Sequence, residues 1–131
     1  MEKVIKNMNF KPILENIVYK RLAEPAPSST INMRVWDEMK VERLRQDAVK
    51  VYFKRNVKPQ PDSLFSLEAE MSVEVIVNGQ EFDDLADAVA YFKNSQVARV
   101  LASTVGTVVA ELTLHSQIGP MMTAPVAQFP Q

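Results

Sequence analysis

Apolar and polar residues alternate along the first two-thirds of the chain, which is the pattern of β-strands that bury one face. The clearest run spans 65–77, where apolar residues point one way and serines and glutamates point the other. Similar alternation predicts strands at 10–22, 31–44 and 49–57. The strand at 10–22 has apolar side chains on both faces, so we expect cover on both sides, one of them supplied by another subunit.

Charged residues modify this alternation at two places. Asp37 interrupts the apolar face of the second predicted strand, which predicts a bulge or kink near Trp36 and Asp37. Lys50 and Lys54 would stand across from the glutamates of the last predicted strand if the two strands pair as neighbours. Each such exposed pair would contribute about 0.2–1 kcal/mol to stability.

The last third of the chain has helical spacing. A short amphipathic helix is predicted at 82–92, and a longer apolar helix at 97–114 with Ser95 as its N-cap. Small residues recur at every fourth position of the longer helix and would let another backbone approach closely. We expect this ridge to form an oligomer interface made by Ala98, Ala102, Gly106 and Ala110.

Strands grouped before helices predict an α+β fold. In this fold a four-stranded antiparallel sheet is covered on one face by the short and the long C-terminal helices. The chain has 131 residues and is 47% hydrophobic, so we expect one domain spanning 1–131 with its own core.

Charge and composition argue against several classes of protein. The 15 Lys+Arg and 16 Asp+Glu leave a formal net charge of −1, which gives no support for nucleic-acid binding. The chain has no cysteine, so disulfide frameworks and thiolate zinc sites are excluded. The N-terminal residues lack the apolar core of a signal peptide, and no run approaches the roughly 20 apolar residues of a membrane span. We therefore expect a cytoplasmic protein without membrane insertion.

Few residues suit catalysis or metal binding. His115 is the only histidine, and a histidine at a helix C-terminus usually caps the helix or faces solvent. Three glycines are too few for a phosphate-binding loop. Glu68, Glu70 and Glu74 share one strand face, a pattern that is more often a solvated surface than a metal site. We predict no catalytic residue, no metal, no cofactor and no enzyme activity.

The more informative residues are apolar and lie beside breaks in regular structure. Trp36, Met121 and Met122 are of this kind, and methionine suits surfaces that accept varied partners. The two helices can cover one sheet face, but the first strand, the small-residue ridge and the apolar tail still need cover. Association of identical copies would provide it, so we predict a homo-oligomer.

Three segments resemble the SecB-type export chaperones. FKPILENIVYKRLAEP, at 10–25, is similar to the opening strand of that family and its exit into an acidic-proline segment. Trp36 followed by DEMKVERLR resembles the tryptophan of the crossover loop and the charged second strand. MMTAPVAQF, at 121–129, is similar to the terminal L-x-L-A-P-V-N-F segment. The order and length of the elements also agree, and the chain looks closer to divergent SecB-like proteins than to the well-known members.

This resemblance implies a SecB-like fold assembled as a homotetramer, a dimer of dimers. It also implies an ATP-independent holdase that binds unfolded polypeptides in apolar grooves between sheet, crossover loop and helix. By resemblance Trp36 lines such a groove, and we add four neighbours from their position along the chain. The predicted peptide-binding residues are Met33, Val35, Trp36, Met121 and Met122.

The cellular role and two other function classes stay open at this point. SecB-like proteins serve preprotein export, docking on the secretion motor through an acidic face, or protect the antitoxin of a toxin–antitoxin pair. Here Lys50 and Lys54 interrupt the acidic face, which puts motor docking in doubt. One alternative is a small hot-dog-like enzyme, although its helix normally comes early in the chain. Another is a structural or adaptor protein with one fixed partner.

Overall fold

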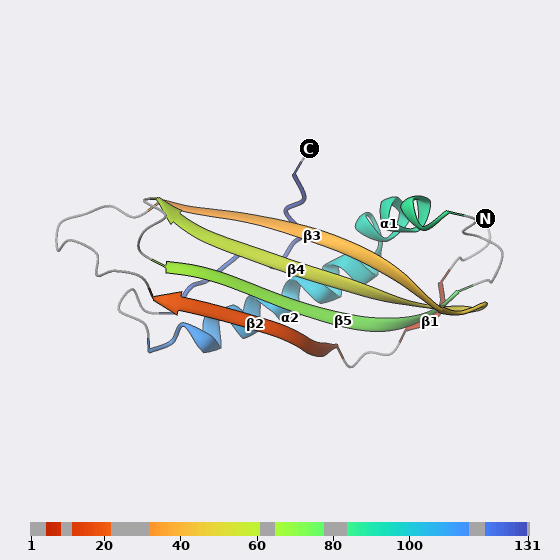
Figure 1. Ribbon diagram of the computed structural model, residues 1–131, viewed down its shortest axis with the longest axis horizontal. Coiled ribbons are helices and arrows are strands. Elements are labelled where there is room, and N and C mark those ends of the chain that lie inside the picture. Colours follow the sequence, from red (N-terminus) through yellow and green to blue (C-terminus); the bar gives the residue numbers. More distant parts are fainter. Residues whose placement is uncertain are drawn as a thin grey trace.

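The computed structural model describes residues 5–8, 12–21, 32–60, 65–77, 84–115 and 120–130. Within these residues the chain forms five strands and two helices (Figure 1). Residues 120–130 follow the last helix without regular structure and are called the C-terminal segment below. The elements are β1 (Ile5–Met8), β2 (Ile13–Arg21), β3 (Asn32–Arg45), β4 (Ala48–Gln60), β5 (Phe65–Val77), α1 (Leu85–Lys93) and α2 (Gln96–Leu112).

The strands form one antiparallel sheet organised around β5. On one side β5 pairs with β4, which pairs with β3. On its other side β1 pairs with residues 75–77 of β5 and β2 pairs with residues 65–72, so β1 and β2 lie end to end (Figure 1). The sheet therefore has four strand positions, which confirms the predicted four-stranded antiparallel sheet with two C-terminal helices. The sequence analysis did not predict β1.

The two helices pack on the sheet in different places (Figure 1). α2 contacts β4 and β5 on one face, whereas α1 packs against β3. Asp84 caps α1 by accepting a hydrogen bond from the Ala86 N–H, and Ser95 caps α2 by accepting one from Val97, as predicted. Neither α1 nor α2 has the length and hydropathy needed to cross a membrane. The face of the sheet that carries α2 is called the helix face below, and the opposite face is called the open face.

The small-residue ridge of α2 is partly covered by its own chain. Ala98 and Ala102 of this ridge are 2% and 0% exposed in the single subunit. A Cβ added at the ridge glycine would lie 3.5 Å from Thr123 Oγ1 and 3.6 Å from a guanidinium nitrogen of Arg55. Burial within one subunit leaves Ala98 and Ala102 little surface for a partner, whereas Gly106 and Ala110 are half-buried. The oligomer interface predicted at these four residues stays a prediction.

β3 passes through Trp36 and Asp37 without a bulge, so the kink predicted there is wrong. Pairing with β4 continues in unbroken register through both residues, and the register shift of this pair lies between Arg43 and Arg45. Asp37 stays on the helix face, where its carboxylate meets Arg55 from β4. The strand therefore accommodates Asp37 on its apolar face by pairing it with Arg55, and the backbone stays regular.

β2 is poorly covered by its own subunit. Ile13 and Leu14 are 51% and 47% exposed, and Tyr19 is 36% exposed. Among the described residues β2 pairs only with β5, so its outer edge is open. A single copy therefore does not provide the two-sided cover that the sequence pattern requires for this strand.

Candidate functional site

The helix face contains one fully buried ion pair. Arg55 of β4 and Asp37 of β3 stand opposite each other, and both side chains are 0% exposed. Two parallel hydrogen bonds join them, from Arg55 Nε to Asp37 Oδ1 at 2.8 Å and from Nη2 to Oδ2 at 3.0 Å. This two-bond geometry is the strongest arrangement of a guanidinium with a carboxylate. It fixes both side chains under the C-terminal segment.

The remaining donors of Arg55 bind the C-terminal segment. Its Nη1 donates to Thr123 Oγ1 and to the Ala124 carbonyl, each at 2.8 Å, and its Nη2 donates to the Val126 carbonyl at 3.0 Å. A segment without regular structure must satisfy its buried backbone groups by other means. Arg55 does so here for two backbone carbonyls, those of Ala124 and Val126, and also binds the side-chain hydroxyl of Thr123.

Asp37 and α2 hold the two ends of the same segment. The Gln128 N–H donates to Asp37 Oδ2 at 2.6 Å, and the Asp37 N–H donates to the Gln128 carbonyl at 3.0 Å. At the other end, the Met121 N–H donates to the buried hydroxyl of Thr113 at 2.7 Å. The C-terminal segment is therefore tied to the sheet by side chains of β3 and β4, and to the end of α2 by Thr113, the C-cap residue of that helix.

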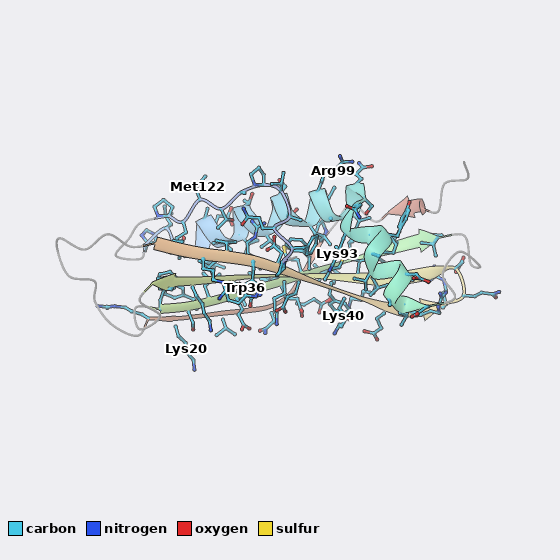
Figure 2. The ribbon with its side chains drawn as sticks, turned by 90° about the horizontal axis from the view of Figure 1, so that it is seen from above. Lys20, Trp36, Lys40, Lys93, Arg99 and Met122 are labelled. Atoms are coloured by element: carbon cyan, nitrogen blue, oxygen red, sulfur yellow. The ribbon has the colours of Figure 1, made fainter. Side chains whose placement is uncertain are left out.

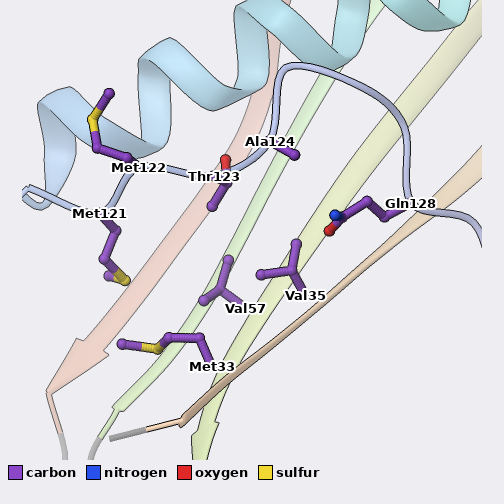
Figure 3. Close-up of a pocket in the computed structure, with 8 residues that line it drawn as sticks. All are labelled: Met33, Val35, Val57, Met121, Met122, Thr123, Ala124 and Gln128. Atoms are coloured by element: carbon purple, nitrogen blue, oxygen red, sulfur yellow. The ribbon is translucent and has the colours of Figure 1, made fainter.

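A pocket of about 480 Å³ opens between this segment and the sheet (Figure 3). Figure 3 shows the side chains of Met33, Val57 and Met121 directed toward one another, whereas Met122 points away from the sheet. Met121 is 8% exposed and Met122 is 82% exposed, so one forms the inner wall and the other the rim. The lining residues are Met33, Val35, Val57, Met121, Met122, Thr123, Ala124 and Gln128.

The chemistry of this pocket is that of a flexible apolar binding surface. None of its lining residues carries an ionisable side chain, so they offer no general acid or base. Unbranched methionine side chains adapt their shape to different apolar groups. Thr123 and Gln128 add hydrogen-bonding groups at the border. The volume lies within the range of sites that enclose small ligands or side chains.

Four of the five predicted peptide-binding residues meet in this pocket, namely Met33, Val35, Met121 and Met122. Trp36 does not join them. Its side chain points to the opposite face of β3 from those of Met33 and Val35, and it pairs with Asn56 of β4. It therefore lies on the open face with Lys20 and Lys40 (Figure 2). The resemblance assigned Trp36 to the groove, and position along the chain added Val35 as its neighbour, but successive strand residues point to opposite faces.

The open face carries exposed ion pairs. Lys50 and Lys54 stand across from Glu74 and Glu70, as predicted, but their ammonium groups bind Glu15 at 2.8 Å and Glu38 at 3.2 Å instead. Hydrogen bonding to Lys50, and then to Ser72, lowers the pKa of the Glu15 carboxyl. The same bond to Glu15 raises the pKa of Lys50, and Glu38 raises the pKa of Lys54.

Sequence reasoning missed Arg55. Two signals could have found it: Arg55 stands in phase with Val51, Phe53 and Val57 on an apolar strand face, and Asp37 does the same on the neighbouring strand. Opposite charges at inward positions of two adjacent strands indicate a buried ion pair. His115, the only histidine, is exposed after the end of α2.

Comparison with known proteins identifies the fold. No family model matches the chain, and a search of curated proteins found no match. The structure is similar to the Mycobacterium tuberculosis SecB-like chaperone Rv1957 in complex with a ChAD peptide from the Rv1956 HigA1 antitoxin, with a TM-score of 0.72 and 13% identity over 90% of this chain and 88% of that one. A Streptococcus agalactiae protein of unknown function aligns at a TM-score of 0.46 and 12% identity, covering 90% and 98%. The fold is therefore SecB-like, as the resemblance in sequence implied.

Proposed function

We propose that this protein is an ATP-independent holdase chaperone that binds unfolded polypeptides. The observation that carries the proposal is the solvent-open, methionine-walled pocket between β3, β4 and the C-terminal segment. An exposed apolar surface with flexible side chains suits segments that expose apolar residues without a fixed sequence. The fold it shares with a SecB-like chaperone whose structure contains a bound peptide supports the same assignment.

A client-aggregation assay tests the proposal. The purified protein should slow the aggregation of a slowly refolding client at an equimolar ratio without ATP, and the variant Met33→Gln/Met122→Gln should lose most of this protection. A matched control is Leu85→Gln/Leu112→Gln, because these leucines are 40% and 47% exposed but lie on the helices outside the pocket. If the control lost as much protection as the pocket variant, general surface hydrophobicity rather than the pocket would hold clients.

The chain is further proposed to assemble as a homotetramer, a dimer of dimers, in the cytoplasm. The support is β2, which presents Ile13, Leu14 and Tyr19 to solvent along an open edge. Exposed apolar strand edges invite pairing with another chain, and closed symmetric assembly is the usual outcome. Mass measurement in solution at micromolar concentration should give a species larger than a monomer. The variant Leu14→Glu should shift that species toward the monomer, and a monomer in the unsubstituted protein would contradict the assignment.

Of the two cellular roles, protection of an antitoxin or a similar fixed client is favoured over preprotein export. SecB-type chaperones that dock on the secretion motor present an acidic face, whereas here Lys50 and Lys54 pair with carboxylates across the open face. The purified protein should therefore show no saturable binding to the secretion motor. Saturable binding that is lost in Glu70→Gln/Glu74→Gln would instead support the export role.

A further inference from the structure

The open face has two parts that differ in how their charges are arranged. In the first part, each lysine of β4 has a glutamate on both neighbouring strands. Lys54 stands between Glu38 and Glu70, and the row of Lys50 is built in the same way. These rows neutralise themselves, so they offer little attraction to a charged partner.

The end of the open face where β4 finishes has a different composition. Arg34 pairs with Lys58, and Lys20 pairs with Ser66 at the same end of the sheet. These three basic side chains are exposed, and none of them has a carboxylate partner among the described residues. The guanidinium of Arg34 lies over the indole of Trp36, 4.8 Å from its centroid. Figure 2 shows Lys20 and Trp36 on the side of the sheet away from α2.

We propose that this cluster of Lys20, Arg34, Trp36 and Lys58 is a docking site for a short acidic peptide segment that carries an apolar residue. The cations would pair with its carboxylates, and the indole would contact its apolar side chain. The site is separate from the methionine-walled pocket, because the two lie on opposite faces of the sheet.

The dimensions of the cluster fit a peptide. Neighbouring strands lie about 4.8 Å apart, so the distance from Arg34 on β3 to Lys20 on β2 is about 14 Å. An extended peptide covers this distance with about four residues. Glu68 lies in the row of Trp36, and Glu38 and Glu70 lie in the row after it. These carboxylates would repel a longer anion that continued along the face. A short acidic segment therefore matches the cluster better than the continuous phosphate backbone of a nucleic acid, which needs a longer basic track.

The site contains its own reporter, because Trp36 is the only tryptophan of the chain. The probe is a short peptide with two glutamates on each side of one leucine, compared with a peptide in which glutamines replace the glutamates. Titration of the full chain with the glutamate peptide should change the Trp36 fluorescence in a saturable way, and added salt should weaken the binding. The glutamine peptide should bind at least about tenfold more weakly.

Two double variants locate the effect. Lys20→Gln/Lys58→Gln should weaken binding of the glutamate peptide about tenfold. Lys50→Gln/Lys54→Gln removes the same charge from the self-neutralised part of the same face and should change binding by less than about twofold. Loss of client protection in Met33→Gln/Met122→Gln with unchanged peptide binding would show that the two sites are independent.

Three results would overturn this assignment. The first is no saturable change in Trp36 fluorescence with the glutamate peptide. The second is an equal loss of binding in both lysine double variants, which would indicate a general charge effect. The third is tighter binding of a labelled oligothymidine than of the glutamate peptide, which would make the cluster a nucleic-acid site.

Discussion

Each face of the sheet has an ion pair between β3 and β4, but the two pairs differ in burial and in what they hold in place. On the helix face, Arg55 and Asp37 are 0% exposed and bind the C-terminal segment. On the open face, Lys54 and Glu38 are 32% and 52% exposed and join two strands that already pair through their backbones. Burial makes a charged pair costly to break, whereas solvent screens an exposed pair. The difference indicates that the buried pair, unlike the exposed one, holds the wall of the methionine pocket in position.

The largest expected effect comes from breaking the buried pair on one side. Asp37→Ala leaves the guanidinium of Arg55 buried without its carboxylate, so the free energy of unfolding should fall by about 3–5 kcal/mol. The control Glu38→Ala removes the carboxylate of the neighbouring exposed pair and should cost less than about 1 kcal/mol. Denaturant unfolding of both variants checks the comparison, and similar losses would contradict the distinction between the two faces.

Removing both charges should restore the free energy of unfolding but still release the C-terminal segment. Asp37→Leu/Arg55→Met replaces the pair by apolar side chains, so we expect it to recover most of the stability that Asp37→Ala loses. The donors to Thr123, Ala124 and Val126 are nevertheless gone. Limited proteolysis should therefore cut within 120–130 faster than in the unsubstituted chain. Unchanged protection of this segment would show that packing alone holds it.

Gly106 offers a smaller test of the contact between α2 and the C-terminal segment. Gly106→Ala places its Cβ at ordinary contact distance from Thr123 and improves helix propensity, so it should stabilise the fold by about 0.5–1 kcal/mol. Gly106→Leu should displace the segment and cost about 1–3 kcal/mol. Thermal unfolding of the two variants measures both values. An equally stable leucine variant would mean that the segment does not lie against this position.

The smallest effect concerns the pH dependence contributed by the open face. Lys50 lowers the pKa of Glu15 below 4.5, so its contribution to stability is present above about pH 4.5 and is lost as the pH falls through the lowered pKa. Glu15→Gln should therefore remove a small part of the acid-induced loss of stability. Unfolding curves measured across the acidic range check this, and an unchanged pH dependence would indicate that solvent screens the pair completely.

Alternation of side chains predicted the fold, but it did not predict what the charged inward positions do. Residues 65–77 show how complete the pattern can be, because strand period and burial agree there at nearly every position. Asp37 predicted a bulge in its own strand because its partner Arg55 lies on another strand. Pairing of strands is non-local and cannot be read from one segment. Met33, Met121 and Met122 line one pocket, whereas Trp36, which the resemblance had grouped with them, lies on the other face because β3 continues through it in regular register.

Site-specific photo-crosslinking tests the central claim most directly. A photoreactive side chain in place of Met122, at the rim of the pocket, should crosslink an unfolded client, and the same group in place of Leu85 on α1 should not. The crosslink at position 122 should weaken in Asp37→Leu/Arg55→Met, where the C-terminal segment is no longer held. Equal crosslinking from both positions, or none from position 122, would contradict a client site built by the anchored C-terminal segment.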